Sequence, residues 1–241
     1  MRKNLLLLCL LPLQLFAQAL GNFEPFEAGD VLVYSVNANG NVKKLEYNYL
    51  TVDKNGVAGK VIYGDKEGEF KSSGLGLQDK DFGLSNSQIF LLTPAAKIFE
   101  PGIQVGNKWN DVFEAKGETL TGQVIRQSQA SKLEKVKLKF GEYDAILIAE
   151  NSVLQGITNK SEVFSGKSSG KIWVGVVNNR ALILKRENQN SFGEKFVQEL
   201  AEIPKVSDVQ KKLEKLKELH KQGLINDTEY ESKRKELLKT L

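Results

Sequence analysis

The sequence predicts a mainly β protein, in which a curved antiparallel sheet or incomplete barrel is followed by a C-terminal two-helix hairpin. Apolar or alternating segments, separated by glycine and asparagine turns, recur about ten times between residues 31 and 203. Helical periodicity with clear start and stop signals is confined to residues 206–241. We therefore divide the chain into a signal peptide (1–19), a β-domain (20–204) and a helical hairpin (205–241).

The N-terminus has the features of a signal peptide. Arg2 and Lys3 precede an apolar run, Leu5–Phe16, and the small-x-small pattern Ala17-Gln18-Ala19 follows it. The run is too short for a membrane span, which needs roughly 20 residues. Cleavage is expected after Ala19, with Ala17 as the second choice, and a retained anchor stays open as the alternative. The mature protein is thus predicted to be periplasmic or secreted, with no transmembrane segment.

Residue counts exclude several kinds of chemistry in the body of the chain. The single cysteine, Cys9, lies within the apolar run and leaves with it, and the single histidine, His220, lies in the terminal hairpin. A Ser-His-Asp or Cys-His catalytic site and a histidine-ligated zinc site are therefore excluded there. The chain has 34 basic and 30 acidic residues, and the part from Ala19 to Val206 carries 23 of each. We expect no nucleic-acid partner, metal or cofactor.

Strand signals account for most of the body. Asn178-Asn179 is the best tight-hairpin signal, because asparagine tolerates positive φ. The last segment could instead begin a helix, and Gly166-Lys167-Ser168 is better explained by a hairpin loop than by the end of a phosphate-binding loop. The predicted strands are Val31–Val36, Val42–Val52, Val57–Tyr63, Lys108–Ala115, Glu118–Gln127, Lys132–Phe140, Tyr143–Leu154, Ile172–Val177, Ala181–Arg186 and Phe192–Ile203.

The segment Ser72–Gly102 breaks this rhythm, because it combines glycines and prolines with many apolar residues. One interpretation is a long loop whose apolar side chains close one end of the barrel. Another is a lid or helix lining an apolar ligand cavity, and a third is a partner-binding patch. The candidate lid residues are Leu75, Leu77, Phe82, Phe90, Leu92 and Phe99.

Three stretches of the body resemble exported LolA-like bacterial proteins. They are Phe23–Tyr34 (FEPFEAGDVLVY), Val105–Trp109 (VGNKW) and Phe140–Leu147 (FGEYDAIL). The resemblance implies a curved antiparallel sheet forming an incomplete barrel around an apolar cavity. No ligand-binding residue is carried over by it.

Two short amphipathic helices are predicted at the C-terminus. Gly223 ends the first helix in a left-handed conformation, and His220 and Lys221 lie in its last turn, where the helix dipole favours cations. Asn226 and Glu229 form a capping box for the second helix. Such a hairpin is too small to bury a core of its own and must pack on something.

The residues LxxLKELHKQGLINDTEYESKRKELL in this hairpin resemble the SHOCT family of short C-terminal domains. The resemblance implies an oligomerisation or docking module without catalytic residues. The corresponding contact residues would be Leu213, Leu216, Leu219, Leu224, Ile225, Tyr230, Leu237 and Leu238.

These features favour a non-enzymatic exported envelope protein, whose β-domain binds an apolar ligand such as a lipid, or a protein partner, and whose hairpin joins it to itself or to another protein. One alternative is a structural or assembly factor without a ligand. The other is a carboxylate-based hydrolase, which needs two carboxyl groups facing each other across a cleft. The candidate carboxylates for such an enzyme are Glu100, Asp111, Glu114, Glu118, Asp144 and Glu150.

Overall fold

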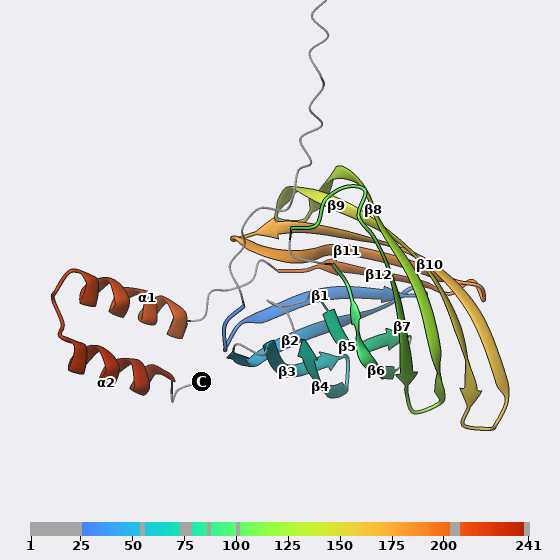
Figure 1. Ribbon diagram of the computed structural model, residues 1–241, viewed down its shortest axis with the longest axis horizontal. Helices are drawn as coiled ribbons and strands as arrows, with labels where there is room; N and C mark the ends of the chain where they lie inside the picture. The colour runs from blue at the N-terminus through green and yellow to red at the C-terminus, as the bar shows by residue number, and fades with distance from the viewer. Residues whose placement is uncertain are drawn as a thin grey trace, which may run out of the picture.

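The computed structural model describes residues 26–53, 56–72, 79–85, 88–99, 102–202 and 208–238. These residues form twelve strands and two helices (Figure 1), which confirms the predicted fold class. The elements are β1 (Val31–Ala38), β2 (Asn41–Asp53), β3 (Gly56–Tyr63), β4 (Lys66–Ser72), β5 (Asp79–Ser85), β6 (Gln88–Lys97), β7 (Lys108–Lys116), β8 (Leu120–Leu138), β9 (Gly141–Thr158), β10 (Val163–Val177), β11 (Arg180–Asn190), β12 (Lys195–Leu200), α1 (Asp208–Lys221) and α2 (Asp227–Leu238).

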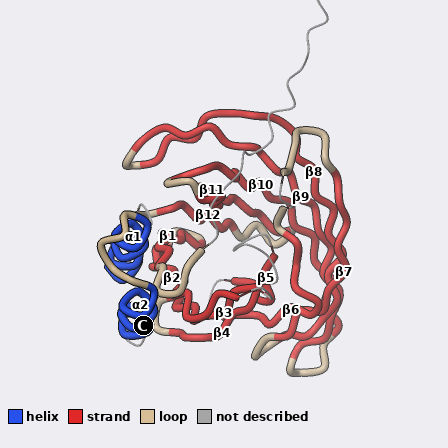
Figure 2. Tube along the Cα trace, turned by 60° about the vertical axis from the view of Figure 1, so that its left-hand side comes forward, coloured by secondary structure: helices blue, strands red, loops and turns tan. Residues whose placement is uncertain are grey.

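All twelve strands belong to one antiparallel sheet with the order β4-β3-β2-β1-β12-β11-β10-β9-β8-β7-β6-β5. Neighbours in the sheet are neighbours in sequence except β1 and β12, which pair with Tyr34 opposite Leu200. The sheet curls so far that its two edge strands, β4 and β5, come close together (Figure 2). The result is a nearly closed barrel, in agreement with the predicted incomplete barrel.

Two predicted hairpins are confirmed. β2 and β3 pair with Tyr47 opposite Val61. At the β10–β11 turn, Asn178 and Asn179 have φ values of 50° and 61°, the left-handed conformation that asparagine tolerates.

Several predicted boundaries are wrong. Residues 118–140 were expected to form two strands, but β8 runs through them, and its pairing with β9 shifts between Ala130 and Lys132, as at a β-bulge. β10 begins at Val163, so the Gly166–Ser168 stretch lies within a strand and is not a hairpin loop. β12 is a strand, which excludes the helical alternative. The segment 72–102 is not a long loop, because it contains β5 and β6.

The main core fills the barrel where β1–β3 face β9–β11. Alternate residues of β1 and β2 point into it, among them Leu32 and Tyr34 of β1 and Leu45 and Tyr47 of β2, each at most 1% exposed. A second, smaller cluster contains Leu92, Ala96, Phe113 and Ala115, with Phe90 and Val124 packed against it. It lies on β6–β8, outside the main core.

The predicted helix signals are present in the C-terminal hairpin. Gly223 has a φ of 70°, and the Leu224 N–H donates to the Leu219 carbonyl at 3.0 Å, as in a Schellman motif. The Glu229 N–H donates to Asn226 Oδ1 at 2.9 Å, and the Asn226 N–H donates to Glu229 Oε2 at 3.0 Å. This reciprocal pair is the predicted capping box. No helix among the described residues is both long and apolar enough to cross a membrane.

Candidate functional site

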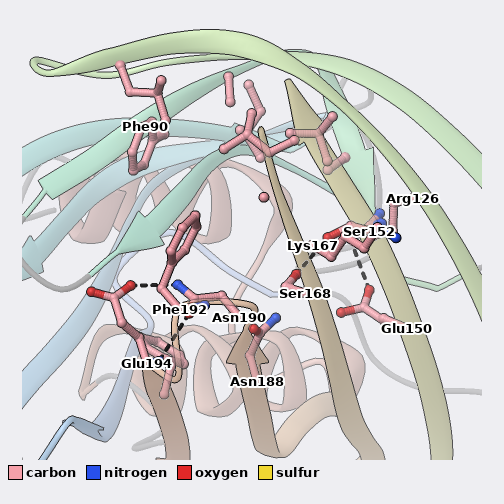
Figure 3. A pocket seen from close by; sticks show the side chains of 18 of the residues that line it. Phe90, Arg126, Glu150, Ser152, Lys167, Ser168, Asn188, Asn190, Phe192 and Glu194 are labelled. Carbon is pink, nitrogen blue, oxygen red and sulfur yellow. Dashed lines mark hydrogen bonds and ion pairs between the residues drawn. The ribbon is translucent and has the colours of Figure 1, made fainter. Parts of the chain in front are cut away.

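A cavity of about 520 Å³ lies on the inner face of the sheet and is lined by residues of the strands from β6 to β12 (Figure 3). On β9 the residues that line it, Glu150, Ser152 and Leu154, share the face that carries the core residues Ile146 and Ile148. The alternation of side chains along β9 therefore continues the core face into the cavity. Along this face, the lining changes from polar at Glu150 and Ser152 to apolar at Leu154.

The lining follows cross-strand rows of the sheet. One row, Phe113–Val124–Leu154–Gly166, is apolar. The next two rows are largely polar and contain Arg126–Ser152–Ser168–Asn190 and Ser128–Glu150–Gly170–Asn188. Beyond them lies the row that joins the main core, which carries Ile148, Ile172 and Arg186. A polar band thus separates the core from an apolar wall.

We define the apolar wall as the larger hydrophobic residues that line the cavity. Phe164 and Phe192 contribute rings whose centroids are 5.2 Å apart, and Phe192 is 60% exposed. A Cβ atom at Gly166 would lie only 3.1 Å from the Phe192 ring, so glycine at this position leaves room for both rings. The wall consists of Phe90, Leu92, Phe113, Leu120, Val124, Leu154, Phe164 and Phe192. Phe196 also lines the cavity, but it lies opposite Asn188 in the polar band and packs against the main core, so it is not part of the wall.

The polar band is organised around the guanidinium of Arg126, whose side chain is 6% exposed. Arg126 Nη1 donates to Glu150 Oε1 at 3.0 Å and Arg126 Nε donates to Asp111 Oδ2 at 3.0 Å, while Nη2 donates to Asp111 and to the Lys97 carbonyl. The other oxygen of Glu150 accepts a hydrogen bond of 3.1 Å from Arg186 Nη2. Two arginines and two carboxylates therefore form a neutral cluster, which compensates for their desolvation.

Smaller polar groups complete the band. The Ser152 and Ser168 hydroxyls are 2.7 Å apart and hydrogen-bonded to each other. The Ser128 hydroxyl is buried and has no hydrogen-bond partner within the part of the chain that the structure describes. At the rim, Asn190 Nδ2 donates to Glu194 Oε2 at 2.6 Å (Figure 3). The band therefore offers hydroxyl and amide groups beside a neutralised charge cluster.

The candidate carboxylates do not form a catalytic pair across an open cleft. Asp111 and Glu150 come together, but the guanidinium of Arg126 bonds to both of them. Glu118 pairs with Lys66 and Asp144 with Lys135 at exposed positions, Glu114 is exposed, and Glu100 lies outside the described residues. In the described ranges, no cluster of three His, Cys, Asp or Glu residues is arranged to hold a metal ion.

Two of the six candidate lid residues line the cavity. These are Phe90 and Leu92 of β6. Phe99 is instead buried in the main core. Phe82 lies on β5, whose side chains are outside the description, and Leu75 and Leu77 are outside it altogether. The lid itself stays a prediction.

The candidate docking residues lie on the hairpin with different degrees of burial. Leu216 is buried, and Leu224 is 65% exposed at the turn. The others are half-buried: Leu213, Leu219, Ile225, Tyr230 and Leu237. The side chain of Leu238 is outside the description. His220 stacks on Tyr230 with ring centroids 4.5 Å apart and pairs with Asp227 at 2.6 Å, so it joins the end of α1 to the start of α2.

Sequence reasoning missed most of the cavity. The signal that could have found part of it is the period-two pattern Phe164-x-Gly166-x-Ser168-x-Gly170, which places one aromatic and three small residues on one face of a strand. The contributions of Arg126 and Arg186 could not be read in this way, because their partners come from other strands.

Comparisons with known proteins identify the C-terminal segment. Residues 211–238 match the family model SHOCT, described as a short C-terminal domain, which confirms the resemblance of the hairpin. The structure is similar to the crystal structure of the hypothetical lipoprotein YmcC from Escherichia coli (K12), with a TM-score of 0.43 and 9% identity over 72% of this chain and 85% of that one. No curated protein matches the chain. The kinship of the body to LolA-like proteins stays a prediction.

Proposed function

We propose that this chain is a non-enzymatic, exported envelope protein that binds an apolar ligand in the cavity of its β-domain and uses its C-terminal hairpin for oligomerisation or docking. The observation that carries the proposal is the cavity of about 520 Å³, whose lining includes the apolar wall. Ligand pockets of small molecules have volumes of about 300–1,000 Å³ and are lined mainly by apolar and aromatic side chains.

The apolar wall supports binding because it exposes hydrophobic surface that a soluble domain would otherwise bury. Phe192 is the clearest case, since its ring is largely exposed and lies beside Phe164. Covering such rings releases about 25 cal/mol for each Å² removed from water. A ligand with an alkyl or aromatic group would gain this energy.

The hairpin supports the second half of the proposal. It belongs to a segment that matches the SHOCT family model, and its apolar side chains are only partly covered. A hairpin of two short helices gains most of its stability from packing against another surface. A second copy of this chain or another protein would supply that surface.

Export and the absence of enzymatic activity belong to the same proposal. Residues 1–19 have the charge, apolar length and small-residue pattern of a signal peptide, which would deliver the mature chain to the periplasm or the medium. Among the candidate carboxylates that the structure describes, Asp111 and Glu150 come together, and the bonds that Arg126 donates to both of them argue against a role as general acid or base.

The proposal is tested with N-phenyl-1-naphthylamine, an uncharged apolar dye whose fluorescence rises in apolar sites. We expect saturable binding to the purified protein and a bound small molecule in native mass spectra of protein isolated from its own envelope. Leu154→Ser should weaken dye binding about tenfold, because it replaces an apolar wall residue by a polar one. Val153→Ser, on the other face of β9, is the matched control and should bind as wild type. A protein that takes up no dye and carries no small molecule would contradict ligand binding and favour the assembly factor without a ligand.

A further inference from the structure

The cavity is not uniformly apolar, and its polar band points to the chemistry of the ligand. We propose that the ligand is a single-chain amphiphile whose anionic, oxygen-bearing head, a carboxylate or a phosphate, is held by Arg186, Asn188 and Ser168, while its chain lies along the apolar wall. This inference rests on the proposed function, because it assigns the ligand class of the same cavity.

The head-binding groups lie on neighbouring strands. Arg186 and Asn188 are two residues apart on β11 and both line the cavity, as does Ser168 of β10. Asn188 lies opposite Gly170, and a Cβ atom at Gly170 would lie 3.3 Å from Asn188 Nδ2, so glycine at this position leaves room for the Asn188 amide. Figure 3 shows Ser168 and Asn188 on the same side of the cavity as Glu150.

These groups have donors to spare. A guanidinium carries five N–H donors, and among the described residues Arg186 uses one of its nitrogens, Nη2, for a bond to Glu150. The Asn188 amide forms no side-chain hydrogen bond within the described ranges, and in the Ser152–Ser168 pair only one of the two hydroxyl hydrogens can lie between the oxygens. A head group that only accepts hydrogen bonds therefore fits this end of the cavity.

Arg186 is the cation that an anionic head would reach. Lys167 and Lys195 border the cavity, but both are exposed and alternate along their strands with inward-facing residues, so they are not counted as head-binding groups. Arg126 is engaged by Asp111 and Glu150, whereas Arg186 bonds to only one oxygen of Glu150. Arg186 therefore has donors left for the oxygens of a monoanionic head.

The volume fits one chain. Liquid water occupies roughly 30 Å³ per oxygen atom, and at that share a cavity of about 520 Å³ holds about seventeen non-hydrogen atoms. Dodecanoate and dodecyl phosphate have about this size. The polar band lies between the main core and the apolar wall, so the head would lie next to the core and the chain would extend along β7–β10 towards their hairpin ends.

The test is displacement of the bound dye by three 12-carbon compounds: dodecanoate, dodecyl phosphate and uncharged dodecanol. We expect each anion to displace the dye at about tenfold lower concentration than dodecanol. Arg186→Gln should remove this advantage, so that the two anions and dodecanol then displace the dye at similar concentrations. Lys185→Gln is the matched control, because Lys185 is the preceding residue of β11 but lies over the Trp173 ring, away from the cavity. The two anions distinguish a carboxylate from a phosphate head.

The outcomes separate the two proposals. If wild-type protein does not bind the dye, the proposed function is wrong, and the head-group inference is wrong with it. If the dye binds but dodecanol competes as well as the anions, or Arg186→Gln weakens all three compounds equally, only the head-group inference is overturned. Asn188→Leu, which leaves all charges in place, should weaken both anions about threefold, and it provides a second reading if Arg186→Gln does not fold.

Discussion

At the scale of single residues, the most consequential group is the buried cluster around Arg126. Its hydrogen bonds join the carbonyl of Lys97 on β6, Asp111 on β7 and Glu150 on β9, and Arg186 on β11 completes it. Burying an ion costs several kcal/mol, and only the mutual pairing compensates for this cost. The cluster therefore fixes the relative positions of strands that flank the cavity.

Replacing Glu150 tests how far the stability of the fold depends on the pairing in this cluster. Glu150→Gln leaves Arg186 without a counter-ion and Arg126 with one, so we expect the free energy of unfolding to fall by about 3 kcal/mol or more, measured by urea denaturation. Glu187→Gln is the control. Glu187 pairs with Lys185 at 2.7 Å, and the side chains of Glu187 and Lys185 are 40% and 29% exposed. It should change stability by less than about 1 kcal/mol. Equal effects of the two substitutions would contradict a structural role for the cluster.

A second residue-scale feature is a group of buried tyrosines in the main core. Tyr34 and Tyr47 pack edge to face with ring centroids 5.7 Å apart, and Tyr49 stacks on Phe26 at 4.4 Å. Burial raises the pKa of all three phenols, since the phenolate would lose its hydration. The Tyr34 hydroxyl also has no hydrogen-bond partner among the described residues.

These raised pKa values predict a loss of stability at alkaline pH. Above the unfolded-state value of about 10, the unfolded chain releases protons that the folded chain retains, so the free energy of unfolding falls as the pH rises. Each buried tyrosine contributes a slope of about 1.4 kcal/mol per pH unit in that range. Tyr34→Phe should reduce the total slope by this amount without lowering stability at pH 7, as measured by urea denaturation from pH 8 to 11. Parallel curves for the variant and wild type would contradict it.

At the scale of elements, the helices were predictable and several strands were not. The hairpin is specified by local signals, since Gly223 and the pair Asn226–Glu229 act within one or two turns of chain. The strands β5, β6 and β10 are specified by neighbours far away in sequence. The glycines and serines of β5 and β10 and Pro94 of β6 suggested loops, yet pairing with adjacent strands imposes an extended backbone on them.

The capping box gives the prediction at this scale. Asn226→Ala removes the acceptor for the Glu229 N–H, which should cost the start of α2 about 1 kcal/mol. We expect amide hydrogen exchange in the first turns of α2 to become about fivefold faster. Ser232→Ala, at an exposed position within α2, is the control and should leave exchange unchanged or slower. Unchanged exchange in Asn226→Ala would mean that packing, and not the cap, holds this end of the helix.

At the scale of the whole molecule, the cavity follows from the closure of the sheet. The pairing of β1 with β12 joins residues more than 150 positions apart, which no local pattern predicts. The curl of the sheet from β6 to β12 brings Phe90 and Leu92 of β6 to the same cavity as residues of β10 and β11. Two apolar residues of 72–102 line the cavity, but their place in a strand that forms one wall depends on the tertiary fold.

The last prediction concerns the hairpin and the barrel as separate units. Every residue of the main core lies between residues 26 and 200, so deleting residues 207–241 should leave the thermal unfolding of the β-domain unchanged. The same deletion should lower the number of copies in each particle, measured by size-exclusion chromatography with light scattering as the ratio of particle mass to chain mass, because it removes the proposed docking surface. In the full chain, Leu224→Glu should act in the same direction, since Leu224 is exposed at the hairpin turn, whereas Ser232→Glu should not. The same number of copies for the full and shortened chains would contradict self-association and leave docking to a different protein, for which a mixed complex would have to be isolated.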